Sequence, residues 1–217
     1  LLEKLEVKRF RIQSIVLCPT RELADQVANE IRRLARSIHN IKVLTLCGGK
    51  PFGPQIGSLE HGAHIIVGTP GRIEEHIRKG SLVLENVSMF VLDEADRMLD
   101  MGFQQAIDDI VSYMPKQRQT MLFSATYPEK IEKTAQRIMQ SPVTVEVQDS
   151  HSNQSIVETL YQVENNESRV EAVRLLLQAH QPETTLIFCN TKIETDQVAN
   201  KLRAVGYEAL ALHGDLE

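Results

Sequence analysis

Hydrophobic and polar positions alternate along this chain in two recurring patterns. Short, nearly uninterrupted apolar runs are typical of buried strands, and longer stretches in which apolar residues return at helical spacing are typical of helices. The expected strands are 12–18, 42–47, 64–68, 89–92, 119–124, 143–147, 157–163, 185–189 and 209–212. The expected helices are 22–37, 72–79, 103–114, 129–140, 168–179 and 193–205. Strands that alternate with helices in this way predict an α/β fold, in which a mostly parallel sheet lies between two helical layers.

The alternation is interrupted at 148–155. This segment reads QDSHSNQS, a polar run without an apolar anchor, which is typical of a linker. We therefore expect a first domain at 1–147 and a second domain at 156–217. The second part holds few expected strands, which make a poor sheet by themselves, so we expect it to be the N-terminal part of a domain.

Composition narrows the class of protein. The 217 residues are 42% hydrophobic and 24% charged, as in an ordinary soluble globular protein. A net charge of -5 argues against a broadly basic surface, so any contact with nucleic acid must come from locally placed donors. Cys18, Cys47 and Cys189 lie far apart in apolar runs, which predicts buried thiols in a reducing compartment and a cytoplasmic location. The chain shows neither a membrane-length apolar run nor a signal-peptide pattern at its start, and we expect no membrane partner.

An apolar strand that ends in two acids is the most distinctive stretch. The run MFVLDEAD places Asp93 and Glu94 directly after the strand 89–92 and Asp96 in the following turn. Ligands of open α/β sheets bind at the carboxyl ends of strands, so these acids are placed to hold a metal ion and to orient or deprotonate a water. For this motif taken alone, a solvated acidic turn is the commoner explanation.

Four of the expected strands are followed by a threonine near a helix start, namely Thr20 in CPTRE, Thr69 in GTPGR, Thr126 in FSATYPE and Thr191 in FCNTKIE. Thr69 with Pro70 predicts an N-cap followed by proline at the first helical position. Thr126 with Glu129, and Thr191 with Glu194, fit the capping box. Helix starts present free N–H groups and a positive dipole end, so a row of them would bind phosphates even on an acidic protein.

Neighbouring residues favour phosphate binding over plain helix capping. Arg21 and Arg72 closely follow their threonines and could reach a phosphate with two parallel hydrogen bonds. Gly48 and Gly49 would let the backbone approach a polyanion closely, although a tight turn explains them equally well.

A phosphate-cradling loop is not found within these 217 residues. Gly49–Lys50 is the single Gly-Lys pair, but Leu44 and Pro51 occupy the places where that loop needs a glycine and a Ser or Thr. The residues thus indicate a nucleoside triphosphatase while lacking the element that holds the β and γ phosphates.

With these motifs in order, the chain resembles the DEAD-box ATP-dependent RNA helicases. The resemblance rests on PTRELADQ at 19–26, Gly48–Gly49, TPGR at 69–72, VLDEADRMLDMGF at 91–103, SAT at 124–126 and IFCNT at 187–191. It implies the RecA-like fold of the P-loop NTPase superfamily and helicase superfamily 2. On this basis we expect a first RecA-like domain without its phosphate loop, followed by the start of a second.

The resemblance also implies ATP and magnesium as cofactors and assigns roles to the acidic side. Asp93 would hold magnesium through water, and Glu94 would position the attacking water. Asp96, Ser124 and Thr126 would couple the nucleotide site to closure of the two domains.

RNA is the partner that the resemblance implies, either single-stranded or duplex. The residues expected to hold its sugar-phosphate backbone are Pro19, Thr20, Arg21, Glu22, Gly48, Gly49, Thr69, Pro70, Gly71 and Arg72. The helix after Thr69 would clash with a continuous duplex and bend one strand. LTLCGGKPFGPQIGSLEHGAHIIVGTPGR and LHGDLE are similar to a bacterial branch of the family that acts on large-subunit ribosomal RNA during ribosome assembly. We expect a monomer.

Departures from the family pattern leave other interpretations open. The adenine-reading motif, the phosphate loop, a second RNA-contacting motif and the arginine finger would lie outside these residues. We therefore expect the 217-residue polypeptide itself to be inactive as an ATPase. Two alternatives remain, which are a metal-dependent phosphohydrolase that uses Asp93, Glu94 and Asp96, and a non-catalytic RNA-binding or remnant fragment.

Overall fold

The computed structural model describes residues 1–147 and 157–215. The chain divides into two compact units, Leu1–Glu146 and Val147–Glu217. The expected linker, 148–155, lies outside the described residues. Within the described ranges, no helix is long and apolar enough to cross a membrane.

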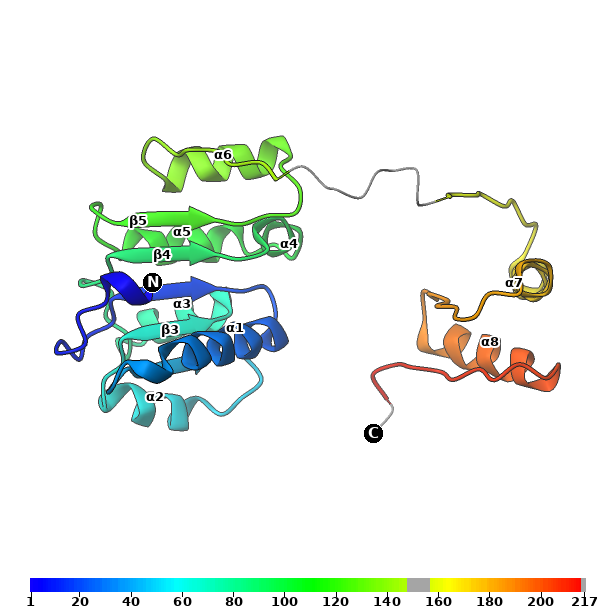
Figure 1. The fold of residues 1–217 in the computed structure, drawn as a ribbon, viewed down its shortest axis with the longest axis horizontal. Coiled ribbons are helices and arrows are strands. Elements are labelled where there is room, and N and C mark those ends of the chain that lie inside the picture. Colours follow the sequence, from blue (N-terminus) through cyan, green and yellow to red (C-terminus); the bar gives the residue numbers. More distant parts are fainter. Residues whose placement is uncertain (148–156, 216–217) are drawn as a thin grey trace. The chain divides into compact units, whose positions relative to one another are not determined.

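The first unit alternates strands and helices, as the sequence predicts (Figure 1). Its strands are β1 (Ser14–Leu17), β2 (Val43–Leu46), β3 (Ile65–Gly68), β4 (Met89–Leu92) and β5 (Gln119–Leu122). Its helices are η1 (Leu2–Lys4), α1 (Arg21–Leu34), η2 (Ala35–Ser37), α2 (Phe52–Glu60), α3 (Pro70–Arg78), α4 (Ala95–Asp100), α5 (Gln104–Ser112) and α6 (Glu129–Ile138).

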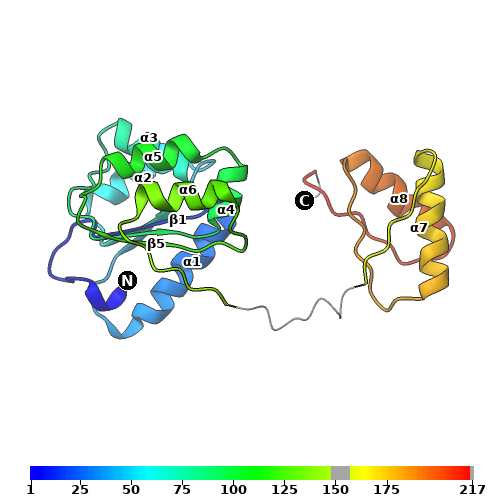
Figure 2. The ribbon, with the colours of Figure 1, turned by 90° about the horizontal axis from the view of Figure 1, so that it is seen from above.

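The strands form one parallel sheet in the order β2-β3-β1-β4-β5. Alternate residues of β1 face different cores: Ile15 and Leu17 pack with side chains of α3 and α5, whereas Val16 packs with α1. Figure 2 shows α1 below the sheet and α3 and α5 above it. A strand buried on both faces is mainly apolar, which explains the run Ile15–Leu17 in β1 and the runs in β3 and β4. The expected α/β fold with a parallel sheet between helices is confirmed.

The second unit contains α7 (Asn166–His180) and α8 (Lys192–Ala204), close to the expected helices. The strands expected at 185–189 and 209–212, and at the described residues of 157–163, are wrong, because the structure has no strand there. Leu186, Phe188, Leu210 and Leu212 are 82%, 92%, 93% and 88% exposed. An extended apolar segment becomes a strand only when neighbours pair its backbone groups, and these segments have no such ladder.

The strand expected at 143–147 is also wrong, for the same reason, and Val143 and Val145 stay exposed. Helix α2 was not expected, because Gly53, Pro54 and Gly57 break the apolar periodicity that predicts helices. The expectation of buried thiols is confirmed for Cys18 and Cys47, while Cys189 is half-buried.

Candidate functional site

The carboxyl ends of all five strands of the first unit lie at one edge of the sheet. The pairing registers place Leu17 beside Gly68 and Leu92, Leu46 beside Gly68, and Leu92 beside Leu122. The polar residues that follow these strands therefore share one edge, which we call the rim. The rim consists of 18–22, 47–50, 68–72, 93–96 and 123–126.

Asp93 and Glu94 continue β4 onto the acidic side of the rim. The Asp93 amide donates to the Leu17 carbonyl over 3.0 Å, which extends the ladder with β1 by one residue. Glu94 has left-handed backbone angles, φ 50° and ψ 54°, and its amide donates to Asp93 Oδ1 over 3.1 Å. Both side chains are half-buried, and Glu94 pairs with the Arg97 guanidinium at 3.2 Å. A non-glycine residue in this conformation is uncommon and favours a functional turn.

Asp96 joins the ends of β4 and β5. Its Oδ2 atom accepts hydrogen bonds from the Thr126 amide at 3.0 Å and the Thr126 hydroxyl at 2.8 Å. Its own amide donates to Ser124 Oγ over 3.2 Å. The capping box expected for Thr126 with Glu129 is wrong, because α6 begins after Pro128 and the Thr126 hydroxyl is directed to Asp96 instead. Asp96 thus contacts both of the other residues assigned to coupling.

Asp93 and Asp96 have pKa values shifted in opposite directions. Burial, together with the neighbouring charge of Glu94, raises the pKa of Asp93 above its usual range, although the Glu94 amide offsets part of this. Burial also acts to raise the pKa of Asp96, but hydrogen bonds led by the Thr126 hydroxyl outweigh it and lower that pKa. Asp93 therefore carries a charge that the protein alone stabilises poorly, whereas Asp96 carries a well-stabilised one.

Asp93 fits a magnesium ion held mainly through water. A cation would favour the ionised form that burial disfavours, and magnesium typically takes one or two carboxylates, several waters and substrate phosphates. Within 1–147 and 157–215, no three His, Cys, Asp or Glu side chains gather as a ready-made metal site. In the water-mediated mode, Asp93 would be the protein's carboxylate.

The other side of the rim brings three expected RNA-contacting segments together. Thr20 caps α1, accepting a hydrogen bond from the Leu23 amide over 3.2 Å. A Cβ atom added to Gly49 would lie 2.4 Å from Arg21 Nη1 and would displace the arginine, and the φ of 73° at Gly49 itself favours glycine. The Gly48 amide lies 3.4 Å from Thr69 Oγ1, to which it donates. Pieces of chain far apart in sequence therefore form one surface.

The remaining expected contacts differ in accessibility. Glu22 and Gly71 are exposed, whereas Pro19 and Pro70 are buried. Thr69 is the N-cap of α3 with Pro70 at its first position, as expected, although the Thr69 side chain makes no capping bond.

Arg72 is already engaged within the protein. Its Nη1 atom donates to the Lys50 carbonyl over 2.9 Å, its Nε atom pairs with Glu75 at 3.1 Å, and its side chain is 12% exposed. The structure thus gives Arg72 a role in holding the turn after β2, and two-pronged capture of a phosphate would require it to leave these partners.

Two residues that support this surface, Gln55 and His76, were not expected from the sequence. Gln55 Nε2 donates to the Cys47 carbonyl over 3.1 Å, and His76 lies 3.0 Å from Gln55 Oε1. In the sequence, the sign of such a role is Gln55, a polar residue beside apolar residues of α2. This sign can be recognised only when the helix itself is known.

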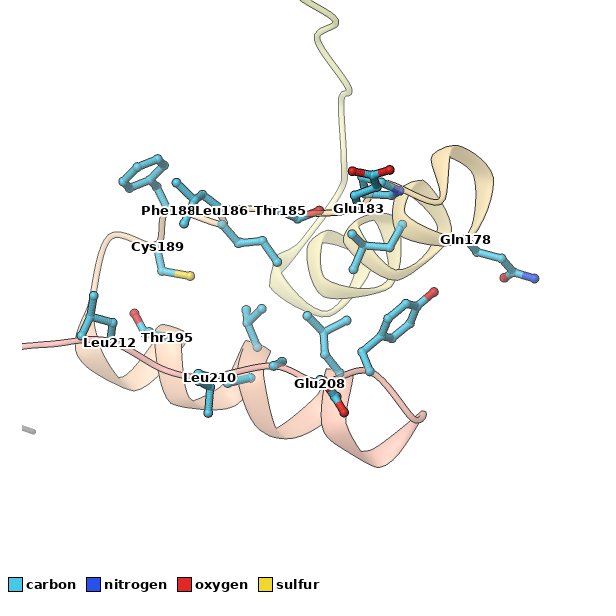
Figure 3. A pocket seen from close by; sticks show the side chains of 18 of the residues that line it. Gln178, Glu183, Thr185, Leu186, Phe188, Cys189, Thr195, Glu208, Leu210 and Leu212 are labelled. Atoms are coloured by element: carbon cyan, nitrogen blue, oxygen red, sulfur yellow. The ribbon is translucent and has the colours of Figure 1, made fainter.

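The second unit contains a capped helix start and a hollow. Thr191 caps α8 by accepting a hydrogen bond from the Glu194 amide over 3.1 Å, which confirms half of the expected capping box. A hollow of about 760 Å³ lies between α7, α8 and the extended segments at 185–189 and 207–212. In Figure 3 the Cys189 side chain points into this hollow, while Phe188 points away from it. The lining of this hollow includes none of the residues expected to act in catalysis.

The parallel sheet and the polar residues along the rim agree with the class expected from the sequence, that of a DEAD-box helicase. Comparison with known protein families gives the same class. A family model described as DEAD/DEAH box helicase matches residues 1–134, so the chain belongs to this family. The expected resemblance to DEAD-box helicases is confirmed.

Similar proteins narrow the relationship further. The chain is 48% identical over 217 residues to the ATP-dependent RNA helicase DbpA of Escherichia coli, covering 100% of this chain and 47% of that protein. It is 40% identical over 216 residues to the DEAD-box ATP-dependent RNA helicase CshA of Geobacillus kaustophilus, covering 46% of that protein. The chain therefore spans about half the length of the curated relatives it matches.

Solved structures agree with this assignment. A DEAD box protein from the hyperthermophile Methanococcus jannaschii matches with a TM-score of 0.64 and 40% identity, covering 100% of this chain and 57% of that one. Dbp5 of S. cerevisiae, bound to RNA and ADP BeF3, matches with a TM-score of 0.74 and 29% identity, covering 100% of this chain and 55% of that one.

Proposed function

We propose that this chain forms the ATP-hydrolysing and RNA-binding core region of an ATP-dependent RNA helicase that separates short RNA duplexes. The single observation that carries the proposal is the shared rim, where the acids after β4 and the helix starts after β1 and β3 lie along one sheet edge. A cation and a polyanionic strand need these two kinds of surface side by side.

On the acidic side, the chain's own groups supply binding and orientation. Asp93 would hold magnesium through water, and the ion when bound would neutralise phosphate charge. Glu94 orients the water that attacks the terminal phosphate. Asp96, fixed by Thr126 and bonded through its amide to Ser124, links movement of the β5 end to the acids after β4.

On the RNA side, Arg21 and the turn at Gly48–Gly49 contact the sugar-phosphate backbone, together with the N-terminus of α3 at Thr69. Such contacts read phosphates and 2′-hydroxyls more than bases, which suits an enzyme with little sequence preference in its core. We also propose ribosomal RNA in large-subunit assembly as the target, as the sequence resemblance at 44–72 and 212–217 implies. We further propose a cytoplasmic, monomeric protein, and the free thiols of Cys18 and Cys47 support a reducing location.

RNA binding by the chain is tested with a labelled single-stranded oligouridylate and fluorescence anisotropy at several salt concentrations. Arg21→Ala should weaken binding about tenfold and flatten the salt dependence, because one phosphate contact is lost. Arg78→Ala is the matched control, since this exposed arginine closes the opposite end of α3 and should leave binding unchanged. Equal losses in the two variants would contradict a specific RNA surface at the rim.

Hydrolysis is tested by RNA-stimulated phosphate release. The 217 residues contain no Gly-Lys followed by Ser or Thr, so we propose that this polypeptide alone releases no phosphate. In a longer protein that includes such a loop, Glu94→Gln should abolish release while ATP and RNA binding stay nearly intact. Loss of binding together with turnover would give Glu94 a structural role and refute the assignment.

A further inference from the structure

A buried row of polar groups connects helix α3 to the turn after β2. The Cys47 carbonyl, which immediately precedes Gly48, accepts a hydrogen bond from Gln55 Nε2 at 3.1 Å. Gln55 Oε1 lies 3.0 Å from His76 Nε2, and His76 Nδ1 lies 2.8 Å from Ser81 Oγ. Gln55 is 8% exposed and His76 is 0% exposed. Buried polar groups without solvent are costly unless they are paired, so this row can adopt few other arrangements.

The direction of these hydrogen bonds follows from the amide of Gln55. Its nitrogen donates to a carbonyl, which leaves its oxygen as the acceptor that faces His76. His76 Nε2 must therefore carry the proton and donate to it. Burial, followed by the nearby charge of Arg72, lowers the pKa of His76 to about 4, so the imidazole is neutral at physiological pH.

The same face of α3 holds the far side of the turn. Arg72 and His76 are four positions apart and so lie on one face of the helix. Arg72 Nη1 donates to the Lys50 carbonyl over 2.9 Å, on the other side of Gly48–Gly49. The Phe52 ring stacks on the His76 ring with centroids 4.1 Å apart and planes inclined by 18°. The two glycines are thus flanked on both sides by carbonyl groups whose positions depend on α3.

We propose that Gln55 and His76 are positioning residues, which fix the Gly48–Gly49 turn relative to Thr69 at the start of α3 so that both grip one RNA strand. This inference rests on the proposed RNA-binding function of the rim. Without the row, the turn would still contact α3 through Thr69 and Arg72 but would be held less rigidly, and RNA affinity would fall although no RNA-contacting group had been removed.

The chain contains a matched control for this idea in Gln13. Gln13 is also 8% exposed, and its amide donates to the Glu6 and Arg9 carbonyls at 2.9 Å each, but it precedes β1 at the opposite edge of the sheet. Gln55→Leu and Gln13→Leu should therefore lower thermal stability by similar amounts. Gln55→Leu should weaken binding of labelled oligouridylate about fivefold to tenfold, the loss expected when one or two positioning hydrogen bonds disappear. Gln13→Leu should leave it unchanged.

A second pair of variants separates hydrogen bonding from packing. His76→Leu removes the donor to Gln55 and should weaken RNA binding as Gln55→Leu does. His76→Gln keeps a side-chain N–H donor and should recover part of the affinity. Equal affinity for Gln55→Leu, His76→Leu and the unaltered chain would overturn the inference.

Amide hydrogen exchange tests the positioning role in the absence of RNA. The Gly48 and Gly49 amides should exchange faster in Gln55→Leu than in Gln13→Leu when both are followed by NMR. If the unaltered chain bound no RNA, the proposed function of the rim would fail, while faster exchange at these glycines would still support the positioning role. Unchanged exchange in Gln55→Leu would refute that role whatever the RNA result.

Discussion

The contact between Asp96 and Thr126 should contribute measurably to the stability of the first unit. Asp96 Oδ2 accepts two hydrogen bonds, at 3.0 Å and 2.8 Å. Hydrogen bonds to a charged group contribute roughly 1.5–3 kcal/mol when shielded, and water reaches this pair, so about 1 kcal/mol each is appropriate. We expect Asp96→Ala to lower the free energy of unfolding by about 2 kcal/mol, or the melting temperature by about 6 °C for a unit of this size.

A double-mutant cycle in urea tests this value. Thr126→Ala removes the hydroxyl bond alone and should cost about 1 kcal/mol, with a coupling energy to Asp96→Ala of similar size. Asp100→Asn, an exposed acid at the end of the same helix, serves as the control and should stay within about 0.5 kcal/mol of the unaltered chain. If the two single changes simply add, the contact does not stabilise the protein and the reasoning is refuted.

The pH dependence of this contribution has a defined sign. The folded state lowers the pKa of Asp96, so its stabilisation is fully present above the unfolded pKa and is lost as the pH falls through the lower, folded value. The difference in stability between Asp96→Ala and the unaltered chain should therefore shrink below about pH 4. A difference that stayed constant down to strong acid would contradict an ionised Asp96 in the folded protein.

Three further predictions concern other parts of the rim. Asp93→Asn should raise the urea midpoint at neutral pH and lose that advantage in acid, because the folded state raises the Asp93 pKa and so disfavours its charge; a lower midpoint at pH 7 would contradict this. Gly68→Ala should be severely destabilising by calorimetry, since the new Cβ would lie 2.1 Å from the Leu46 carbonyl oxygen, and a normal melting temperature would show that the sheet can yield. Thr20→Ala should cost about 1 kcal/mol by removing the cap bond to the Leu23 amide, whereas Thr20→Ser should cost far less.

The sequence predicted those features that depend on short-range pattern. Apart from Ser14, the residues of β1, β3 and β4 form unbroken non-polar runs, and Thr20 and Thr191 mark the starts of α1 and α8. Because parallel strands share one direction, their polar ends could be placed at one edge before any coordinates were known.

Features that depend on long-range contact were missed or wrongly expected. The bond between Thr126 and Asp96 joins residues 30 positions apart, and it diverts a hydroxyl that local sequence assigns to a helix cap. His76 and Gln55 are 21 positions apart and meet only when α2 packs on α3. The apolar run at 185–189 predicted a strand. A strand also needs a neighbouring strand to pair with, and the sequence pattern does not show whether one is present.

The exposed leucine and phenylalanine side chains of the second unit affect how chaperones and proteases would recognise this polypeptide. Leu186, Phe188, Leu210 and Leu212 expose apolar surface to water, whereas the five-stranded unit buries a large apolar core. Holdase chaperones and quality-control proteases recognise exposed surface of this kind. Chaperone binding and proteolysis of this polypeptide would therefore begin at the second unit, and the first unit would be degraded more slowly.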